Sequence, residues 1–114
     1  MREEYVLLVR ARRSRRWQLP GGGLKRRESP HAALRREVDE ETGLVARIRV
    51  CSGTYRRSDG SFAIVFLASV AADAEPAGPR NEIRHQRWVR RRKALRLLPR
   101  RARQRLADAL ARHG

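Results

Sequence analysis

The chain has 114 residues, with 28 Lys and Arg against 12 Asp and Glu, which gives a formal net charge of +16. A chain of this length buries one modest core, so we expect a single domain over residues 1–114 with one active site. The single cysteine excludes an internal disulfide, and no apolar run is long enough for a signal peptide or a membrane span, which predicts a soluble cytoplasmic protein without membrane contact.

The high charge supports two interpretations. A positive surface field favours anionic partners such as nucleotides, inositol phosphates, nucleic acid or acidic lipid. All basic residues except Lys25 and Lys93 are arginine, however, which equally fits an arginine-rich coding bias. The acids concentrate between Glu28 and Glu41, whereas residues 83–107 contain none. An acidic cluster inside a basic protein calls for a cation or a special role.

Apolar runs and turn signals predict a mixed order of strands and helices. In chain order we expect strands at residues 5–9, 17–19, 44–55, 61–71 and 86–90, and helices at residues 30–42 and 99–113. The first helix is bracketed by Ser29 as N-cap, Pro30 at the first helical position and Gly43 as a left-handed stop. The Asp59-Gly60 pair predicts a hairpin between the third and fourth strands.

The helix at residues 30–42 places acids on its apolar stripe. The stripe with helical spacing consists of Pro30, Ala33, Leu34, Glu37, Val38 and Glu41. Glu40 borders this stripe, so three carboxylates converge, and their repulsion and desolvation require compensation. A divalent cation such as Mg²⁺ or Mn²⁺ suits these hard oxygen ligands and takes the rest of its shell from water and substrate phosphates.

A solvated helix face with ion pairs is the common alternative for a glutamate-rich helix, and Arg36 and Glu40 have the i, i+4 spacing of such a pair. Here that alternative is weakened because the glutamates lie on the apolar stripe. A glycine turn, Pro20-Gly21-Gly22-Gly23, also precedes the helix, and its backbone can approach a ligand closely.

These residues spell a known signature: Gly22, five residues, Glu28, seven residues, then residues 36–44 with the sequence REVDEETGL. The pattern resembles the complete box of the Nudix hydrolase family. The resemblance implies an α/β fold, an α/β/α sandwich with a mixed β-sheet. It also implies a metal-dependent pyrophosphohydrolase that cleaves a diphosphate linkage in a nucleoside-diphosphate-X substrate, a nucleoside triphosphate or an ADP-ribose-like compound, by water attack on phosphorus.

The same resemblance assigns roles to residues. Glu37, Glu40 and Glu41 match the family's metal ligands, with the carbonyl of Gly21 as a backbone ligand. Glu28 matches an outer glutamate that acts mainly through water. Arg36 matches an arginine that orients a glutamate, since a guanidinium cannot act as a base near neutral pH.

The chain also departs from the family pattern. Lys25, Arg26 and Arg27 fill a loop that often carries an acid and a glycine, so they are candidates for contact with substrate phosphate. Trp17 is a candidate to stack on a base, with the core as its alternative. Little chain precedes the first strand, so we expect a truncated N-terminal edge strand, either open or covered by a second subunit in a homodimer.

Glu82 is a further candidate, as a loop carboxylate that acts as metal ligand or general base. It is isolated in a basic stretch, where an ion pair with Arg80 or Arg84 is nearly as good an interpretation. Other functions remain open as well. Arg15-Arg16-Trp17 before the glycine turn, with the high basicity, also resembles family members that act on diphosphoinositol polyphosphates or RNA 5′ ends. A basic nucleic-acid-binding module with a relic box is a different class, favoured by the acid-free, arginine-rich stretch at residues 84–105. The intact box carboxylates and the few aromatics disfavour the last of these.

Overall fold

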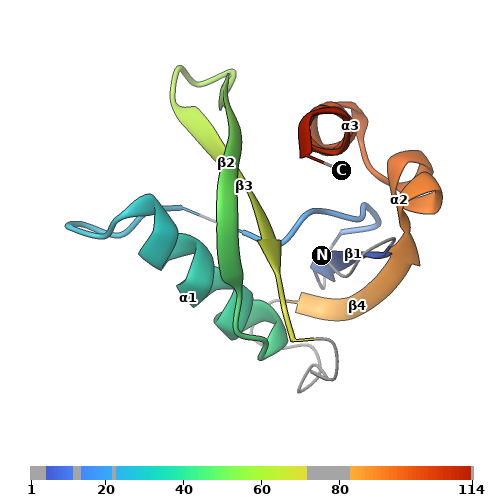
Figure 1. The fold of residues 1–114 in the computed structure, drawn as a ribbon, viewed down its shortest axis with the longest axis horizontal. Helices are drawn as coiled ribbons and strands as arrows, with labels where there is room; N and C mark the ends of the chain where they lie inside the picture. The colour runs from blue at the N-terminus through green and yellow to red at the C-terminus, as the bar shows by residue number, and fades with distance from the viewer. Residues whose placement is uncertain (1–4, 12–13, 22, 72–82, 114) are drawn as a thin grey trace.

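A computed structural model describes residues 5–11, 14–21, 23–71 and 83–113 (Figure 1). In chain order its elements are β1 (Tyr5–Ala11), α1 (Pro30–Thr42), β2 (Arg47–Arg56), β3 (Phe62–Ser69), β4 (Ile83–Arg90), α2 (Arg91–Leu97) and α3 (Arg100–His113). The mixed order of strands and helices expected from the sequence is confirmed with two differences: the expected strand at residues 17–19 is only a single bridge at Gln18, and α2 is an additional element. Among the described residues no helix has the length and apolar character needed to cross a membrane.

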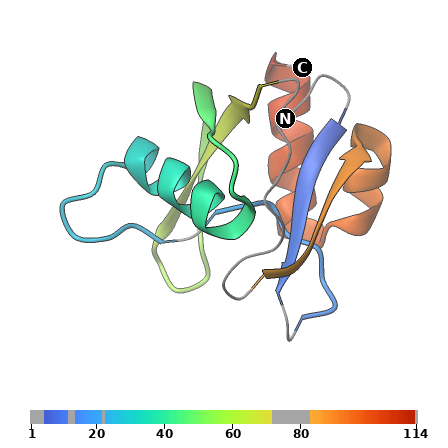
Figure 2. The same ribbon diagram turned by 90° about the horizontal axis from the view of Figure 1, so that it is seen from below.

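Strand β1 lies between two apolar layers. Val6 and Leu8 belong to a core cluster with residues of α2 and α3, whereas Leu7 belongs to a second cluster with Val38 of α1. Alternate residues of a strand point to opposite faces, so one strand serves both clusters. Each fully buried leucine of this kind stabilises the fold by roughly 1.5–3 kcal/mol. The result is an α/β/α arrangement, with α2 and α3 packed on one face of β1 and α1 on the other. Figure 2 shows α1 in front of the β2–β3 pair and the C-terminal helices behind β1 and β4.

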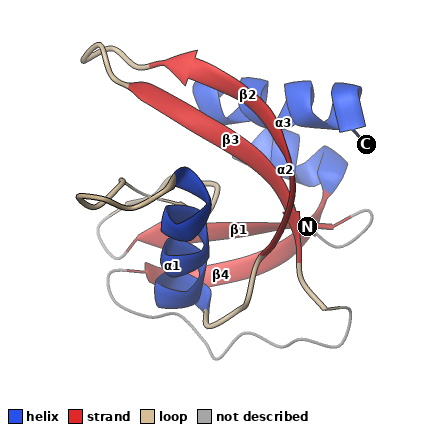
Figure 3. Ribbon diagram, turned by 60° about the vertical axis from the view of Figure 1, so that its left-hand side comes forward, coloured by secondary structure: helices blue, strands red, loops and turns tan. Residues whose placement is uncertain are grey.

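The strands form two antiparallel pairs, β1 with β4 and β2 with β3. The tip of the β2–β3 hairpin is closed by the Arg57 amide, which donates to the Ser61 carbonyl at 2.7 Å, while Gly60 has a φ of 89°. Val9 and Gln18 form an isolated antiparallel bridge on the other edge of β1. Every strand pairing that the described residues make is antiparallel, so the parallel pairing of a mixed sheet is not among them. Figure 3 shows the two strand pairs apart.

Helix α1 has the predicted bounds because its signals are local. The Ser29 hydroxyl accepts a hydrogen bond from the Ala32 amide at 3.1 Å, and Gly43 ends the helix with a φ of 75°. Only glycine adopts such a left-handed conformation without steric cost. On the inner face Ala33 and Val38 are buried, and so is Thr42, whose hydroxyl donates to the Val38 carbonyl at 2.6 Å. The caps therefore fix where the box glutamates lie along the helix.

Helix α2 was not predicted from the sequence. Its N-cap residue, Arg90, makes no side-chain capping hydrogen bond. Instead the helix is held by packing: Ala94 is completely buried, and Leu98, directly after the helix, is 1% exposed. Tertiary contacts of this kind override weak local signals in a seven-residue segment.

Candidate metal and phosphate site

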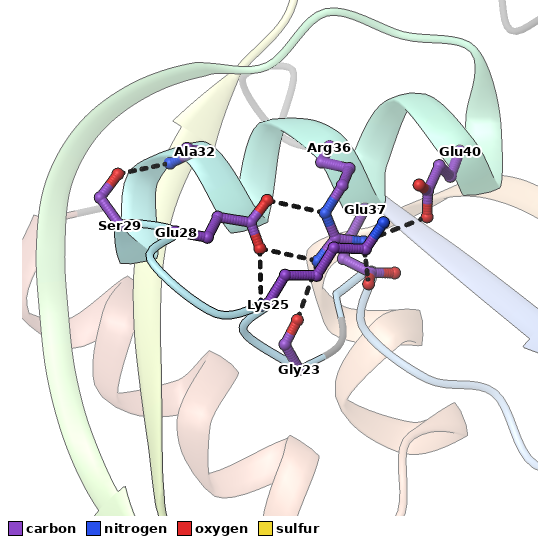
Figure 4. A network of polar contacts seen from close by, with 8 residues as sticks. All are labelled: Gly23, Lys25, Glu28, Ser29, Ala32, Arg36, Glu37 and Glu40. Carbon is purple, nitrogen blue, oxygen red and sulfur yellow. Dashed lines mark hydrogen bonds and ion pairs between the residues drawn. The ribbon is translucent and has the colours of Figure 1, made fainter.

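Arg36 organises the acidic residues of α1. Its guanidinium makes a bidentate contact with Glu28, at 2.7 Å from Nε and 2.9 Å from Nη2. Nη1 donates to Glu37 at 2.7 Å and to Glu40 at 3.2 Å, and Nη2 also donates to the Gly23 carbonyl at 2.9 Å (Figure 4). One side chain thus ties the glycine turn to three glutamates. Charge-assisted bonds in fork geometry are the strongest and most directional that arginine makes.

The electrostatics follow from these contacts. The hydrogen bonds from Arg36, and then that from the Lys25 amide, lower the pKa of Glu28 to about 2. The same partners, Glu28 first and Glu37 second, raise the pKa of the Arg36 guanidinium. Glu28 therefore stays ionised over the whole neutral range and is held directly by protein groups. A carboxylate has about four acceptor sites, so the three hydrogen bonds from Arg36 and Lys25 leave one for the water-mediated metal role that the family resemblance implies for Glu28.

Glu41 is bound differently, because Arg36 makes no ion pair with it. Its carboxylate accepts a hydrogen bond from the Gly21 amide at 3.2 Å. Burial, followed by the charges of Glu37 and Glu40, raises the pKa of Glu41 to about 7, against the opposing effect of the Gly21 hydrogen bond. Gly21 has a φ of 149°, a conformation that favours glycine and brings its backbone close to the acid.

The expected convergence of Glu37, Glu40 and Glu41 on one point is not present in this conformation. Among the described residues no three His, Cys, Asp or Glu side chains gather closely enough to hold a metal ion. The physical reason is that Arg36 draws Glu37 and Glu40 toward itself and supplies the compensating positive charge. The donor set nevertheless fits a hard divalent cation, because it consists of carboxylate oxygens around a half-buried acid, Glu41, with which Arg36 makes no ion pair.

The remaining predicted residues lie in different places. Lys25, Arg26 and Arg27 are exposed in the loop before α1, where Arg27 has a φ of 63°. Trp17 is only 8% exposed and packs in the core cluster that contains Leu8, with the Arg10 guanidinium 4.8 Å from its ring centre. Its position matches the core alternative, and it does not line the cleft described next. Gly22 and Glu82 lie outside the described residues.

A cleft of about 730 Å³ opens between the strand pairs beside the glycine turn. Its walls include Gly21 and Gly23, Leu34 of α1 and most of β3, and it continues to Arg101 and Arg105 of α3. Ligand pockets typically have this size and an apolar lining with a few polar groups. The two arginines of α3 were not singled out in the sequence, although their i, i+4 spacing places them on one helix face.

Comparison with known proteins identifies the family. The model of the NUDIX domain matches residues 1–112, so the chain belongs to the NUDIX domain family. Among solved structures, a NUDIX hydrolase from Nitrosomonas europaea aligns with a TM-score of 0.85 at 21% identity, over 99% of this chain and 66% of that one. An Ap4A hydrolase from C. elegans aligns with a TM-score of 0.82 at 19% identity, over 94% and 85%. The α/β Nudix fold is thereby confirmed.

Sequence relatives match over part of their length. A MutT-like protein from Streptomyces ambofaciens is 34% identical over 71 residues, which are 61% of this chain and 46% of the relative. An RNA pyrophosphohydrolase from Pseudomonas aeruginosa is 44% identical over 55 residues, 46% and 35%. A diphosphoinositol polyphosphate phosphohydrolase from Mus musculus is 40% identical over 58 residues, 50% and 35%. The chain thus spans about a third to a half of these curated relatives.

Proposed function

We propose that this chain is a metal-dependent pyrophosphohydrolase that cleaves the diphosphate linkage of a nucleoside-diphosphate-X compound, a nucleoside triphosphate or an ADP-ribose-like molecule. The observation that carries the proposal is the arrangement of four box glutamates around Arg36 and the glycine turn, next to a cleft of ligand size. The cofactor is Mg²⁺, or Mn²⁺ in its place.

Each residue of the site has a role in this proposal. Glu37, Glu40, Glu41 and the Gly21 carbonyl hold the cation, and Glu28 contributes through water. When bound, the cation polarises the phosphoryl oxygens and neutralises the charge that develops on them. Arg36 is a positioning residue that fixes the glutamates and the glycine turn relative to each other. The exposed basic loop at residues 25–27 attracts the substrate phosphates, and Glu82 takes the proton of the attacking water.

An RNA 5′ end or a diphosphoinositol polyphosphate is the second candidate for the substrate. Two relatives carry these activities in their names, and the net charge of +16 suits a highly anionic substrate. The reaction at phosphorus would be the same. A binding module with a relic box is less favoured, because all the box carboxylates are present.

The test combines a substrate panel with a matched pair of variants. Nucleoside triphosphates, ADP-ribose, triphosphorylated RNA and diphosphoinositol polyphosphates are incubated with Mg²⁺ or Mn²⁺, and released phosphate and pyrophosphate are measured. We expect Glu41→Gln and Glu37→Gln to lower turnover of the preferred substrate at least about a hundredfold, as for the loss of a group that stabilises transition-state charge. Asp39→Asn, which removes an exposed charge from the same helix, should leave turnover unchanged. Near-normal turnover of both glutamine variants at saturating metal would overturn the proposed site.

A further inference from the structure

The cleft connects the glutamate-bearing helix with α3. Figure 1 shows α1 and α3 on opposite sides of the β2–β3 hairpin. The residues that line the cleft come from both sides: Gly21, Leu24 and Leu34 near α1, and Pro99, Arg101 and Arg105 at α3. Between them the wall is apolar and includes Phe62 and Phe66 of β3. The box glutamates are not in this lining, but Gly21, which donates to Glu41, and Gly23, which accepts from Arg36, are part of it. A molecule held beside the glycine turn therefore has room to extend along β3 toward α3.

The charged side chains of this lining all have one sign. They are Arg57 from the hairpin tip and Arg101 and Arg105 from α3, and no described Asp or Glu lines the cleft. Arg101 and Arg105 are separated by one helical turn and therefore share a face. Asp59, close to Arg57, is engaged by the Ser61 hydroxyl at 2.6 Å and the Ser61 amide at 2.9 Å. The α3 side of the cleft is thus positive without acidic residues of its own.

Arg105 is held in place by an aromatic ring. Its guanidinium carbon lies 5.5 Å from the ring centre of Tyr55, whose hydroxyl donates to Asp108 at 2.7 Å. A guanidinium on a ring face keeps its N–H donors in its own plane, where they can reach an anion. Ordering this side chain in advance lowers the entropic cost of binding a ligand there.

We infer that Arg101 and Arg105 form a subsite for a second anionic group of the substrate, a phosphate ester remote from the diphosphate that is cleaved. The inference rests on the proposed function and specifies its substrate class: a nucleoside-diphosphate compound with an additional phosphate. Two arginines on one helix face repel each other, and an anion between them relieves that repulsion. Arginine also binds phosphate in bidentate geometry. The apolar wall between the two ends accommodates the uncharged part of the same molecule.

Matched substrate pairs test the inference. NADPH and NADH differ by one 2′-phosphate, and coenzyme A and dephospho-coenzyme A differ by one 3′-phosphate. We expect the phosphorylated member of at least one pair to have a kcat/KM at least about tenfold higher, mainly through KM, since a remote contact contributes uniform binding. In the double variant Arg101→Gln/Arg105→Gln this preference should fall to within about twofold, while kcat for the member without the phosphate is retained.

The control is Arg92→Gln/Arg96→Gln, which removes the same charge at the same spacing from α2, outside the cleft. This control should keep the preference for the phosphorylated substrate. If loss of the Arg105 contact with Tyr55 unfolds the double variant, the single variant Arg101→Gln, which retains that contact, tests the subsite instead. Equilibrium binding of each pair without divalent metal gives a readout that does not need catalysis. If the protein binds the phosphorylated member more tightly but hydrolyses neither member, the proposed function is wrong and the subsite still stands. Absence of any preference in the parent, or equal loss in both double variants, would overturn the subsite.

Discussion

The charged side chains of the two longest helices, α1 and α3, have different kinds of partner. On α1 two of the four acids, Glu37 and Glu40, are balanced from within, because one guanidinium contacts both of them together with Glu28 just before the helix. On α3 two arginines donate instead to backbone carbonyls, Arg103 to Leu98 at 3.1 Å and Arg112 to Ser52 at 2.6 Å. The acid of α3, Asp108, accepts from Tyr55 and Gln104. The structure thus pairs the acids beside Arg36 outside the lining of the cleft, whereas Arg101 and Arg105 of α3 lie in that lining.

The balance on α1 depends most strongly on Arg36. Replacement by methionine, Arg36→Met, removes the only cation that contacts the three glutamates in the described ion pairs, so they repel one another and the glycine turn loses its tie to the helix. We expect kcat/KM to fall about 10–100-fold, as for other residues that orient metal ligands. Steady-state kinetics measure the change in kcat/KM, and titration with the divalent cation by calorimetry measures the change in metal affinity.

Two further variants sharpen this expectation. Arg36→Lys should rescue little, because an ammonium cannot reproduce the bidentate contact with Glu28 and the contacts with the other acids at once. Arg35→Met removes a neighbouring exposed charge from the same helix and serves as the control. Parent-like kinetics and metal affinity in Arg36→Met would contradict the prediction, because the glutamates would then function without their ion pairs to Arg36.

Glu82 tests whether α1 supplies every carboxylate that the reaction needs. If the loop carboxylate takes the proton of the attacking water, Glu82→Gln should lower kcat at least about tenfold with little change in melting temperature. The competing interpretation, an ion pair with Arg80 or Arg84, predicts almost no kinetic effect. Arg80→Gln is the matched control for loss of that pair. A kcat within about twofold of the parent at saturating substrate and Mg²⁺ would transfer the role of base to Glu37.

The sequence predicts best where structure is locally encoded. Ser29, Pro30 and Gly43 indicated a helix over about residues 30–42, as α1 has it, and the i, i+4 pair of Arg36 with Glu40 is present at 3.2 Å. Asp59 and Gly60 located the hairpin tip, although β2 begins at Arg47 rather than Leu44. Each of these features depends on residues within a few positions of one another.

Features set by distant residues were not predictable in this way. The sequence carries no signal that Arg36 would bind Glu28 in bidentate fashion, because that contact depends on the path of the glycine loop. Helix α2 forms through burial of Ala94 and Leu98, not through caps. The periodic pattern that placed Glu41 on the inner face was sufficient to predict its partial burial, but not that Glu37 and Glu40 would bind Arg36.

Glu41, a half-buried acid of α1 outside the Arg36 ion pairs, gives the smallest expected effect, which concerns stability. Its pKa is about 7 in the folded protein, chiefly because of burial, against 4.5 for the unperturbed group. Between these values the folded protein binds more protons than the unfolded chain, so without metal the free energy of unfolding should fall as pH rises from about 4.5 to 7.

The pKa of Glu28 is lowered, so its contribution is lost only as pH falls from about 4.5 toward 2, outside this window. After allowance for solvent screening we expect a change of about 1 kcal/mol from Glu41. Urea unfolding with EDTA across this range measures it, with Glu41→Gln as the variant that should lose this slope and Asp39→Asn as the control that should keep it. An equal slope in Glu41→Gln would show that a group other than Glu41 causes the pH dependence of the free energy of unfolding.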